Sequence, residues 1–241
     1  MLHSRGARVQ FERPGDLGLP GGLRGETPIS KFLSSVPQAI LSMTGGVELP
    51  PPRTLAITAA IVLPLAGFGW HLRAERLHIE ARASAAASQV AGRSVKVHCP
   101  GQLRRRFIKE IHDGEVMFTD GRPADETKVT ARVCDGIGRL LDKGPALDLA
   151  CLQLDACSKD DTGVAYAVAV LTHESVHMRG VMDEAATECQ AVSRSAGVAQ
   201  ALGASPQAAA YIADWQFSVA DDQLPEQYQT TADCRRPGAA A

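Results

Sequence analysis

This sequence has few aromatic side chains and no large excess of charge of one sign. Phe, Trp and Tyr make up 5% of its 241 residues, and 25 Lys and Arg are balanced by 27 Asp and Glu. Proteins that bind nucleic acid rely on basic patches and on aromatic rings that stack on bases. The three adjacent arginines at 104–106 are typical of a solvated surface rather than of such a patch. We therefore predict no nucleic-acid partner.

Cysteine is absent from the first 98 residues, and no two cysteines are spaced as a CxxC pair. The lack of CxxC argues against a zinc ribbon or a thioredoxin-like site. The six cysteines are Cys99, Cys134, Cys151, Cys157, Cys189 and Cys234. An even number confined to one region predicts three disulfides formed in an oxidising compartment, and six buried free thiols are the alternative.

The first 52 residues have little apolar periodicity. They contain stretches rich in glycine and proline, such as PGDLGLPGG and ELPPPR. This composition supplies too little apolar surface for a core, so we predict a disordered N-terminal segment over 1–52.

The following segment lacks charge. Residues 54–70, TLAITAAIVLPLAGFGW, hold no charged side chain across seventeen positions. Flanking arginines and Trp70 suit a membrane interface, so we predict a transmembrane helix over 53–71. A cleaved signal peptide and a buried core helix are the alternatives, and the small-residue cleavage sites around 83–87 come too late for the first. The cysteines then predict a single-pass cell-membrane protein whose C-terminal part lies outside the cytoplasm.

Residues 72–92 are rich in helix formers and are predicted to form a helical stalk. The remaining chain, 93–241, is predicted to be the folded domain. Short strands are expected at 94–98 and 115–119, bounded by Pro, Gly and Asp. Apolar spacing predicts four helices, over 128–143, 163–179, 182–202 and 206–220. The predicted fold class is therefore mainly α with a small β ribbon, preceded by one transmembrane helix.

The helix expected over 163–179 joins the uncharged run AYAVAVL to the sequence HESVH. His173 and His177 are four residues apart and therefore lie on one face of an α-helix, one turn from each other. Both imidazoles can then bind one cation, while Glu174 points to the side and can reach a water on it. This HExxH arrangement predicts a zinc site on a buried helix. Two solvated histidines beside an exposed glutamate are the structural alternative, which the uncharged run does not favour.

Catalytic zinc requires a third protein ligand and one open position. Gly180 suits the end of the histidine helix, because glycine readily adopts the left-handed conformation that terminates helices. The chain can then turn back towards the metal, and Asp183, Glu184 and Glu188 follow within a few residues. Spacing alone leaves these three acids open as the third ligand.

HESVH followed by DEAATE resembles the gluzincin metallopeptidases, in their small minigluzincin form, which pair HExxH with a helix that bears a glutamate. The resemblance implies a zincin-like fold for 93–241. It implies that Glu184 binds zinc together with His173 and His177. It also implies that Glu188 hydrogen-bonds a ligand histidine, where the family usually has aspartate.

A rival resemblance is to the metzincins, in which Asp183 would be the third ligand. Metzincins also have a methionine turn downstream, and no methionine follows Met182 here. The single span, the cysteines and the tail LPEQYQTTADC together resemble uncharacterised single-span membrane proteins of actinobacteria, a likeness that implies no activity. A disulfide between Cys189 and Cys234 is predicted to tie the glutamate helix to this tail.

These observations predict a membrane-anchored, extracytoplasmic zinc metallopeptidase that hydrolyses peptide or protein substrates. Zn²⁺ would activate a water, and Glu174 would act as the general base. Tyr211, Tyr228 and His112 are candidate donors to the oxyanion, although no spacing singles them out and a structural role is the alternative for each. The strand region 94–119 could pair with an extended peptide. The alternative is a non-catalytic binding module on the same fold, either metal-stabilised or metal-free.

Overall fold

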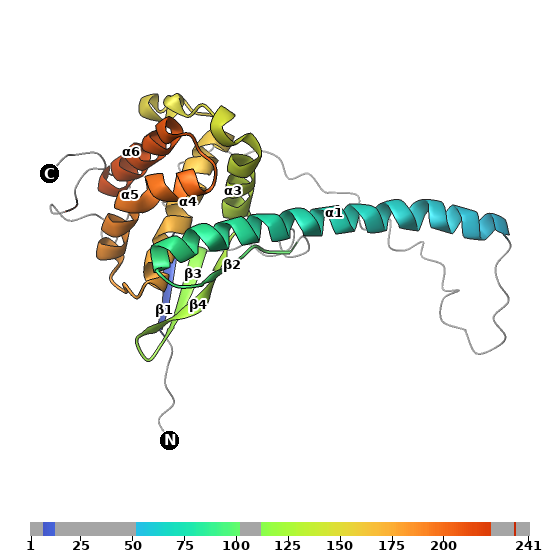
Figure 1. Cartoon of the computed structure of the whole chain (residues 1–241), viewed down its shortest axis with the longest axis horizontal. Coiled ribbons are helices and arrows are strands. Elements are labelled where there is room, and N and C mark those ends of the chain that lie inside the picture. Colours follow the sequence, from blue (N-terminus) through green and yellow to red (C-terminus); the bar gives the residue numbers. More distant parts are fainter. Residues whose placement is uncertain (1–6, 13–51, 102–111, 223–233, 235–241) are drawn as a thin grey trace, which may run out of the picture. The chain divides into compact units, whose positions relative to one another are not determined.

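The computed structural model of this chain describes residues 7–12, 52–101, 112–222 and 234. Its contacts divide the chain into two units, residues 16–73 and residues 1–15 together with 74–241. The larger unit contains the sheet, every helix after the first and all the candidate site residues that the structure describes. Figure 1 shows that the fold is mainly helical with one small sheet.

Helix α1 runs over Pro52–Ala91 as one continuous element of 40 residues (Figure 1). It includes the segment 53–71, for which the sequence predicted a transmembrane helix. Within the described ranges of the chain, no helix is both long enough and apolar enough to cross a membrane, so that prediction is wrong. The uncharged stretch of seventeen residues falls short of the roughly 20 that a span requires, and the helix continues directly into charged sequence.

The C-terminal part of α1 is a core element rather than the separate stalk predicted over 72–92. Its inward face has a helical spacing and consists of the buried residues Ile79, Ala83, Ala86, Ala87, Val90 and Ala91. Small alanines allow close packing on this face. The hydroxyl groups of Ser84 and Ser88 accept hydrogen bonds from the backbone N–H groups of Val97 and Val95, at 2.9 and 3.0 Å. These bonds attach the first strand after α1 to the helix.

The sheet has four strands in the order β1-β3-β4-β2. They are β1 (Ala7–Glu12), β2 (Lys96–His98), β3 (His112–Thr119) and β4 (Arg122–Val129). Strands β1 and β4 both pair antiparallel with β3, whereas β2 pairs parallel with β4. The strands predicted at 94–98 and 115–119 are confirmed as β2 and β3. Strand β4 was not predicted, because its sequence RPADETKV is polar and does not alternate.

Strand β1 corrects the prediction that all of 1–52 is disordered, since residues 7–12 form an edge strand on β3. The other residues of that segment before Pro52 lie outside the described part of the chain. Strands β3 and β4 are joined by the two-residue turn Asp120–Gly121, in which both residues have positive φ, 53° and 75°. Asp-Gly favours this type of tight hairpin turn.

Four helices follow the sheet close to their predicted positions. They are α3 (Ala131–Lys143), α4 (Lys159–Met178), α5 (Glu184–Ala201) and α6 (Pro206–Asp222), with the short 3₁₀ turns η3 (Gly144–Ala146) and η4 (Ala150–Leu154) between α3 and α4. Helices α3 and α4 approach closely at Gly136, where an added Cβ would lie 2.5 Å from the carbonyl oxygen of Gly163. The absence of a side chain at Gly136 therefore allows these two helices to pack closely.

Three disulfides link these elements: Cys99–Cys134, Cys151–Cys157 and Cys189–Cys234. They use all six cysteines, so both the number of disulfides and the predicted pairing of Cys189 with Cys234 are confirmed. The first bond joins the segment after β2 to α3, and the third joins α5 to the C-terminal tail. Disulfides persist in oxidising surroundings, which indicates an extracytoplasmic or secreted environment for this chain.

Candidate metal centre

Helix α4 carries the HESVH sequence through the core. Ser158 caps its first turn by accepting a backbone N–H at 3.2 Å, and residues 164–178 are all buried. At the other end Gly180 has φ 110°, a conformation that suits glycine, and the chain leaves the helix there as predicted. Arg93 donates two hydrogen bonds to the carbonyl of Met178, at 2.9 and 3.1 Å, and so satisfies one of the free carbonyls of the last turn.

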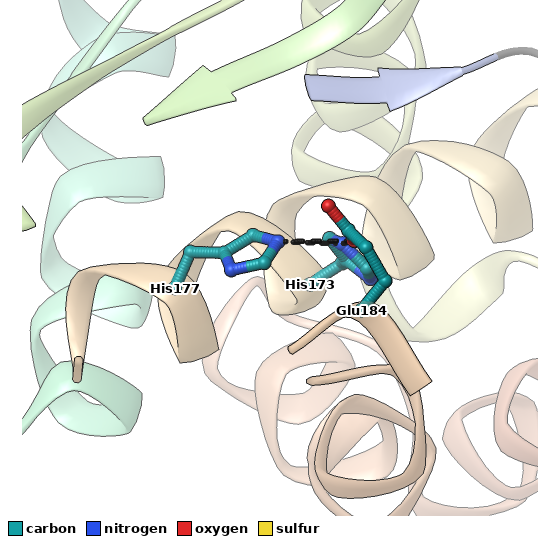
Figure 2. Close-up of side chains that lie close together, drawn as sticks. All are labelled: His173, His177 and Glu184. Carbon is teal, nitrogen blue, oxygen red and sulfur yellow. Dashed lines mark hydrogen bonds and ion pairs between the residues drawn. The ribbon is translucent and has the colours of Figure 1, made fainter. Parts of the chain in front are cut away.

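Three potential metal ligands converge near the C-terminal end of α4 (Figure 2). The Nε2 atoms of His173 and His177 lie 2.9 Å apart. Oε2 of Glu184, from the first turn of α5, lies 3.0 Å from the first of these nitrogens and 3.3 Å from the second. The ligand atoms of a tetrahedral zinc ion, with bonds of about 2.0–2.1 Å, are separated by about 3.3 Å. The triangle of three atoms therefore fits one face of such a site.

The second ring nitrogen of each histidine has its own partner. Nδ1 of His173 lies 2.8 Å from Oε2 of Glu188, and Nδ1 of His177 lies 2.7 Å from the carbonyl oxygen of Val181. A carboxylate and a carbonyl only accept hydrogen bonds, so each Nδ1 carries a proton and donates it. When such a ring is neutral, as it is when it binds a metal ion, its lone pair therefore lies on Nε2, the atom that faces the triangle.

The charges around the triangle also suit a cation. Burial opposes the charged form of His173, but hydrogen bonds with Glu184 and Glu188 outweigh it and raise the pKa of His173 to about 9. Burial likewise opposes ionisation of Glu184, yet hydrogen bonds with His173 and His177 lower the pKa of Glu184 to about 2. In the metal-free chain the protonated imidazole of His173 supplies the positive charge next to the Glu184 carboxylate. A bound metal ion would take the place of this charge.

The structure separates the roles of the three acids that follow Gly180. Asp183 is the N-cap of α5, where its carboxylate accepts the N–H of Ala186 at 2.8 Å. Glu184 faces both histidines and is the partly exposed member of the triangle, with 19% of its side chain accessible. Glu188, one turn later, is buried and hydrogen-bonds His173. Glu184, and not Asp183, therefore completes the triangle.

Glu174 lies beside this cluster on the same helix. Its side chain is fully buried, and neither carboxylate oxygen has a hydrogen-bond partner among the described residues. Burial raises the pKa of Glu174 to about 8. Gly114 of β3 lies directly against it, and a Cβ added there would overlap the Glu174 carboxyl group. An unpartnered buried carboxyl group is costly, so its presence here calls for a functional explanation.

Two contributors to the cluster were not identified from the sequence. Gln216 of α6 is buried and donates from Nε2 to Oε1 of Glu188 at 2.8 Å. The sequence did contain a signal for Gln216. It stands four residues after Ile212, which places its amide on the buried face of α6. The Val181 carbonyl, in contrast, is a backbone group and has no sequence signal.

The predicted oxyanion donors, Tyr211, Tyr228 and His112, and the predicted substrate strand within 94–119 have different surroundings. Tyr211 accepts a hydrogen bond from Gln207 on α6 at 2.8 Å, and Tyr228 lies outside the described residues. His112 begins β3, and its buried Nδ1 has no hydrogen-bond partner in the described part of the chain. Within 94–119, β3 is paired on both sides and β2 is an edge strand. The longer strand of this region therefore offers no open edge to a peptide.

The chain matches no protein-family model, no curated protein and no solved structure. The candidate site is therefore defined by its own geometry. Two imidazole nitrogens and one carboxylate oxygen are a donor set that zinc accepts in proteins, and His173, His177 and Glu184 could together hold a metal ion.

Proposed function

We propose that this chain is an extracytoplasmic zinc-dependent peptidase. One observation supports the proposal above all: three lone-pair atoms of His173, His177 and Glu184 face one another within 3.3 Å, next to the unpartnered carboxyl group of Glu174. A purely structural zinc site would have four protein ligands and no need for a free acid beside them. Three ligands with an adjacent carboxyl group are the parts that metal-assisted hydrolysis requires.

Each residue has a role in this proposal. His173, His177 and Glu184 would hold the ion, and a bound zinc ion supplies a Lewis acid that polarises a carbonyl group and lowers the pKa of water. Glu174 accepts a proton on its carboxylate during attack and releases it to the leaving amine. The pKa of Glu174, raised to about 8 by burial, suits a group that must both take and give a proton near neutral pH.

The experiment that tests the proposal measures zinc and cleavage on the same protein. The full chain, produced with its disulfides formed, is expected to contain about one zinc per chain by elemental analysis. Incubated with a peptide library and followed by mass spectrometry, it should cleave peptides. Glu174→Gln should keep its zinc and lose at least about a hundredfold in rate, because the proton acceptor is gone. Glu126→Gln, which removes an exposed carboxylate of β4, is the matched control.

A metal-stabilised module without turnover is a second candidate, and one observation favours it. The Glu174 carboxyl group is completely buried against Gly114, as a neutral structural group could also be. In that case the zinc-loaded wild type would cleave no member of the library, while removal of zinc would still lower its melting temperature. The same two measurements therefore separate the two candidates.

A further inference from the structure

Strand β1 pairs with β3, the strand that packs against the candidate catalytic residue Glu174. It lies beside β3 and pairs antiparallel with it (Figure 1). The pairing runs from Ala7 opposite Phe118 to Phe11 opposite Gly114. Gly114 is the residue that lies against the Glu174 carboxyl group. Strand β1 also contacts α4, the helix that carries Glu174 and both histidines. The backbone near Phe11 therefore lies next to the part of β3 that borders the site.

The N-terminal strand β1 forms one edge of the sheet. Residues 13–51 stand between it and α1, and β3 is its only neighbour in the sheet. If β1 left, β3 would keep its antiparallel pairing with β4, and the metal-ligand candidates, all of which follow residue 112 in sequence, would be untouched. The sheet can therefore lose β1 and still retain three strands.

We propose that the outer edge of β3 is a peptide-binding edge, which residues 7–12 of the same chain occupy in the manner of a bound extended peptide. This inference rests on the proposed peptidase function and gives it a substrate geometry. The substrate is an extended segment that runs antiparallel to β3, with its backbone opposite Gly114 beside Glu174. Strand addition of this kind draws its affinity from main-chain hydrogen bonds and tolerates many side chains.

A tethered strand excludes competing peptides by its effective concentration. Because β1 and β3 belong to one chain, their pairing is intramolecular, and β1 competes at an effective concentration on the order of millimolar. A free peptide that pairs with the same edge must compete with it. Removal of β1, or loss of its main-chain hydrogen bonds, should therefore strengthen the binding of a free peptide without any change in the site itself.

The test uses a fluorescent peptide of sequence ARVQFE, identical to residues 7–12, and measures its binding by fluorescence anisotropy. Glu174→Gln is the background throughout, so that the peptide stays intact. One variant lacks residues 1–15, and a second carries Val9→Pro with Gln10→Pro. Adjacent residues of an edge strand alternate in their pairing, so one of these two prolines removes a hydrogen bond to β3. Val9→Ala with Gln10→Ala keeps both N–H groups and is the control.

The truncated and proline variants are expected to bind the peptide at least about tenfold more tightly than the full chain and the alanine control, given the tether. A peptide methylated on its backbone nitrogens should bind to none of them. Equal affinity in all variants would overturn the proposal. So would a marked loss of melting temperature in both variants without any gain in peptide binding, because β1 would then be an integral strand.

The binding assay keeps this inference distinct from the proposed function. A chain that binds the peptide only after β1 is removed, but cleaves no library member, supports the peptide edge and contradicts the peptidase. A chain with Glu174 restored that cleaves peptides equally fast with and without residues 1–15 supports the peptidase and contradicts the occupied edge.

Discussion

A hydrogen bond of 2.8 Å joins Nδ1 of His173 to Oε2 of Glu188. The other oxygen of Glu188 accepts a bond of equal length from Nε2 of Gln216. The imidazole that faces the metal triangle is thus held by two successive bonds that run from α4 through α5 to α6. Partners of this kind fix the orientation of a ligand ring and raise its basicity. Helix α6, which provides no ligand, is therefore expected to contribute to metal affinity.

Substitutions along this chain of hydrogen bonds should weaken zinc binding in a graded way. Glu188→Gln removes the charge behind His173, and loss of such a partner typically lowers metal affinity by about 10–100-fold. Gln216→Leu leaves Glu188 in place but removes the donor to Oε1, so a smaller loss, of about tenfold at most, is expected. Competition with a chromophoric chelator measures both affinities.

The double variant Glu188→Gln/Gln216→Leu separates positioning from packing. If Gln216 acts through Glu188, its substitution should have little further effect once Glu188 is changed. Gln207→Leu, on the exposed face of the same helix, should leave zinc affinity unchanged. Fully additive losses in the double variant would mean that Gln216 acts on the metal site by some other route.

Removal of the metal should lower the stability of the fold. A ligand present at a hundred times its dissociation constant stabilises the native state by about 2.7 kcal/mol, provided that it does not bind the unfolded chain. We expect a chelator to lower the melting temperature of the wild type, and zinc in excess to restore it. His177→Ala lacks a ligand, so its melting temperature should not respond to either addition. A wild-type melting curve that is identical with and without chelator would contradict the metal site.

A pH-dependent contribution is expected at the start of α4, far along the helix from the metal ligands. Asp161 accepts hydrogen bonds from Ser158 at 2.7 Å and from Arg139 at 2.8 Å. The Ser158 hydrogen bond, followed by that of Arg139, holds the pKa of Asp161 below its ordinary value of 3.8. Such a carboxylate stabilises the fold above the pKa it has when unfolded. This stabilisation disappears as the pH falls through the lower, folded pKa.

Asp161→Asn should therefore lower the free energy of unfolding by about 1 kcal/mol at neutral pH, as the loss of a helix-cap interaction does. The difference between wild type and variant should shrink once the pH falls below about 4. Denaturant unfolding with the disulfides intact, repeated over this pH range, measures it. Asp160→Asn is the control, because Asp160 is 77% exposed. A difference that stays constant down to low pH would show that the charge of Asp161 is not its cause.

The sequence predicted those features that depend on regular spacing. His173 and His177 follow from the period of the helix, and four helices and two strands follow from apolar patterns and turn residues. Glu184 was named from a resemblance, because spacing left three acids open. The structure separates these acids through a helix cap: Asp183 ends the loop as the N-cap, which turns Glu184 towards the histidines.

The features that the sequence missed depend on contacts between distant segments. Strand β4 has a polar sequence, and its pairing with β3 and β2 is what identifies it as a strand. The uncharged stretch before His71 predicts a membrane span, because hydropathy alone does not reveal that the helix continues to Ala91 and packs in the core. Strand β1 pairs with β3 across about a hundred residues of sequence, a contact that local sequence patterns do not reveal.

The contact between Gly114 and Glu174 provides the most direct test of the space around the carboxyl group. Gly114→Ala adds a methyl group that would overlap this carboxyl, and overpacking of a core typically costs about 1–3 kcal/mol. We expect a loss of this size in the free energy of unfolding, together with a lower rate of peptide cleavage, because Glu174 is displaced. The zinc content should not change, since the ligands lie elsewhere.

Gly197→Ala is the matched control for this substitution. Gly197 is exposed on α5 and has no atom within 4 Å of an added Cβ, so alanine should stabilise the helix there by about 0.5–1 kcal/mol. Opposite signs for the two glycine substitutions would trace the loss at Gly114 to its contact with Glu174. A Gly114→Ala chain as stable and as active as the wild type would mean that β3 can move away from α4. The burial and the raised pKa of Glu174 would then not depend on that strand.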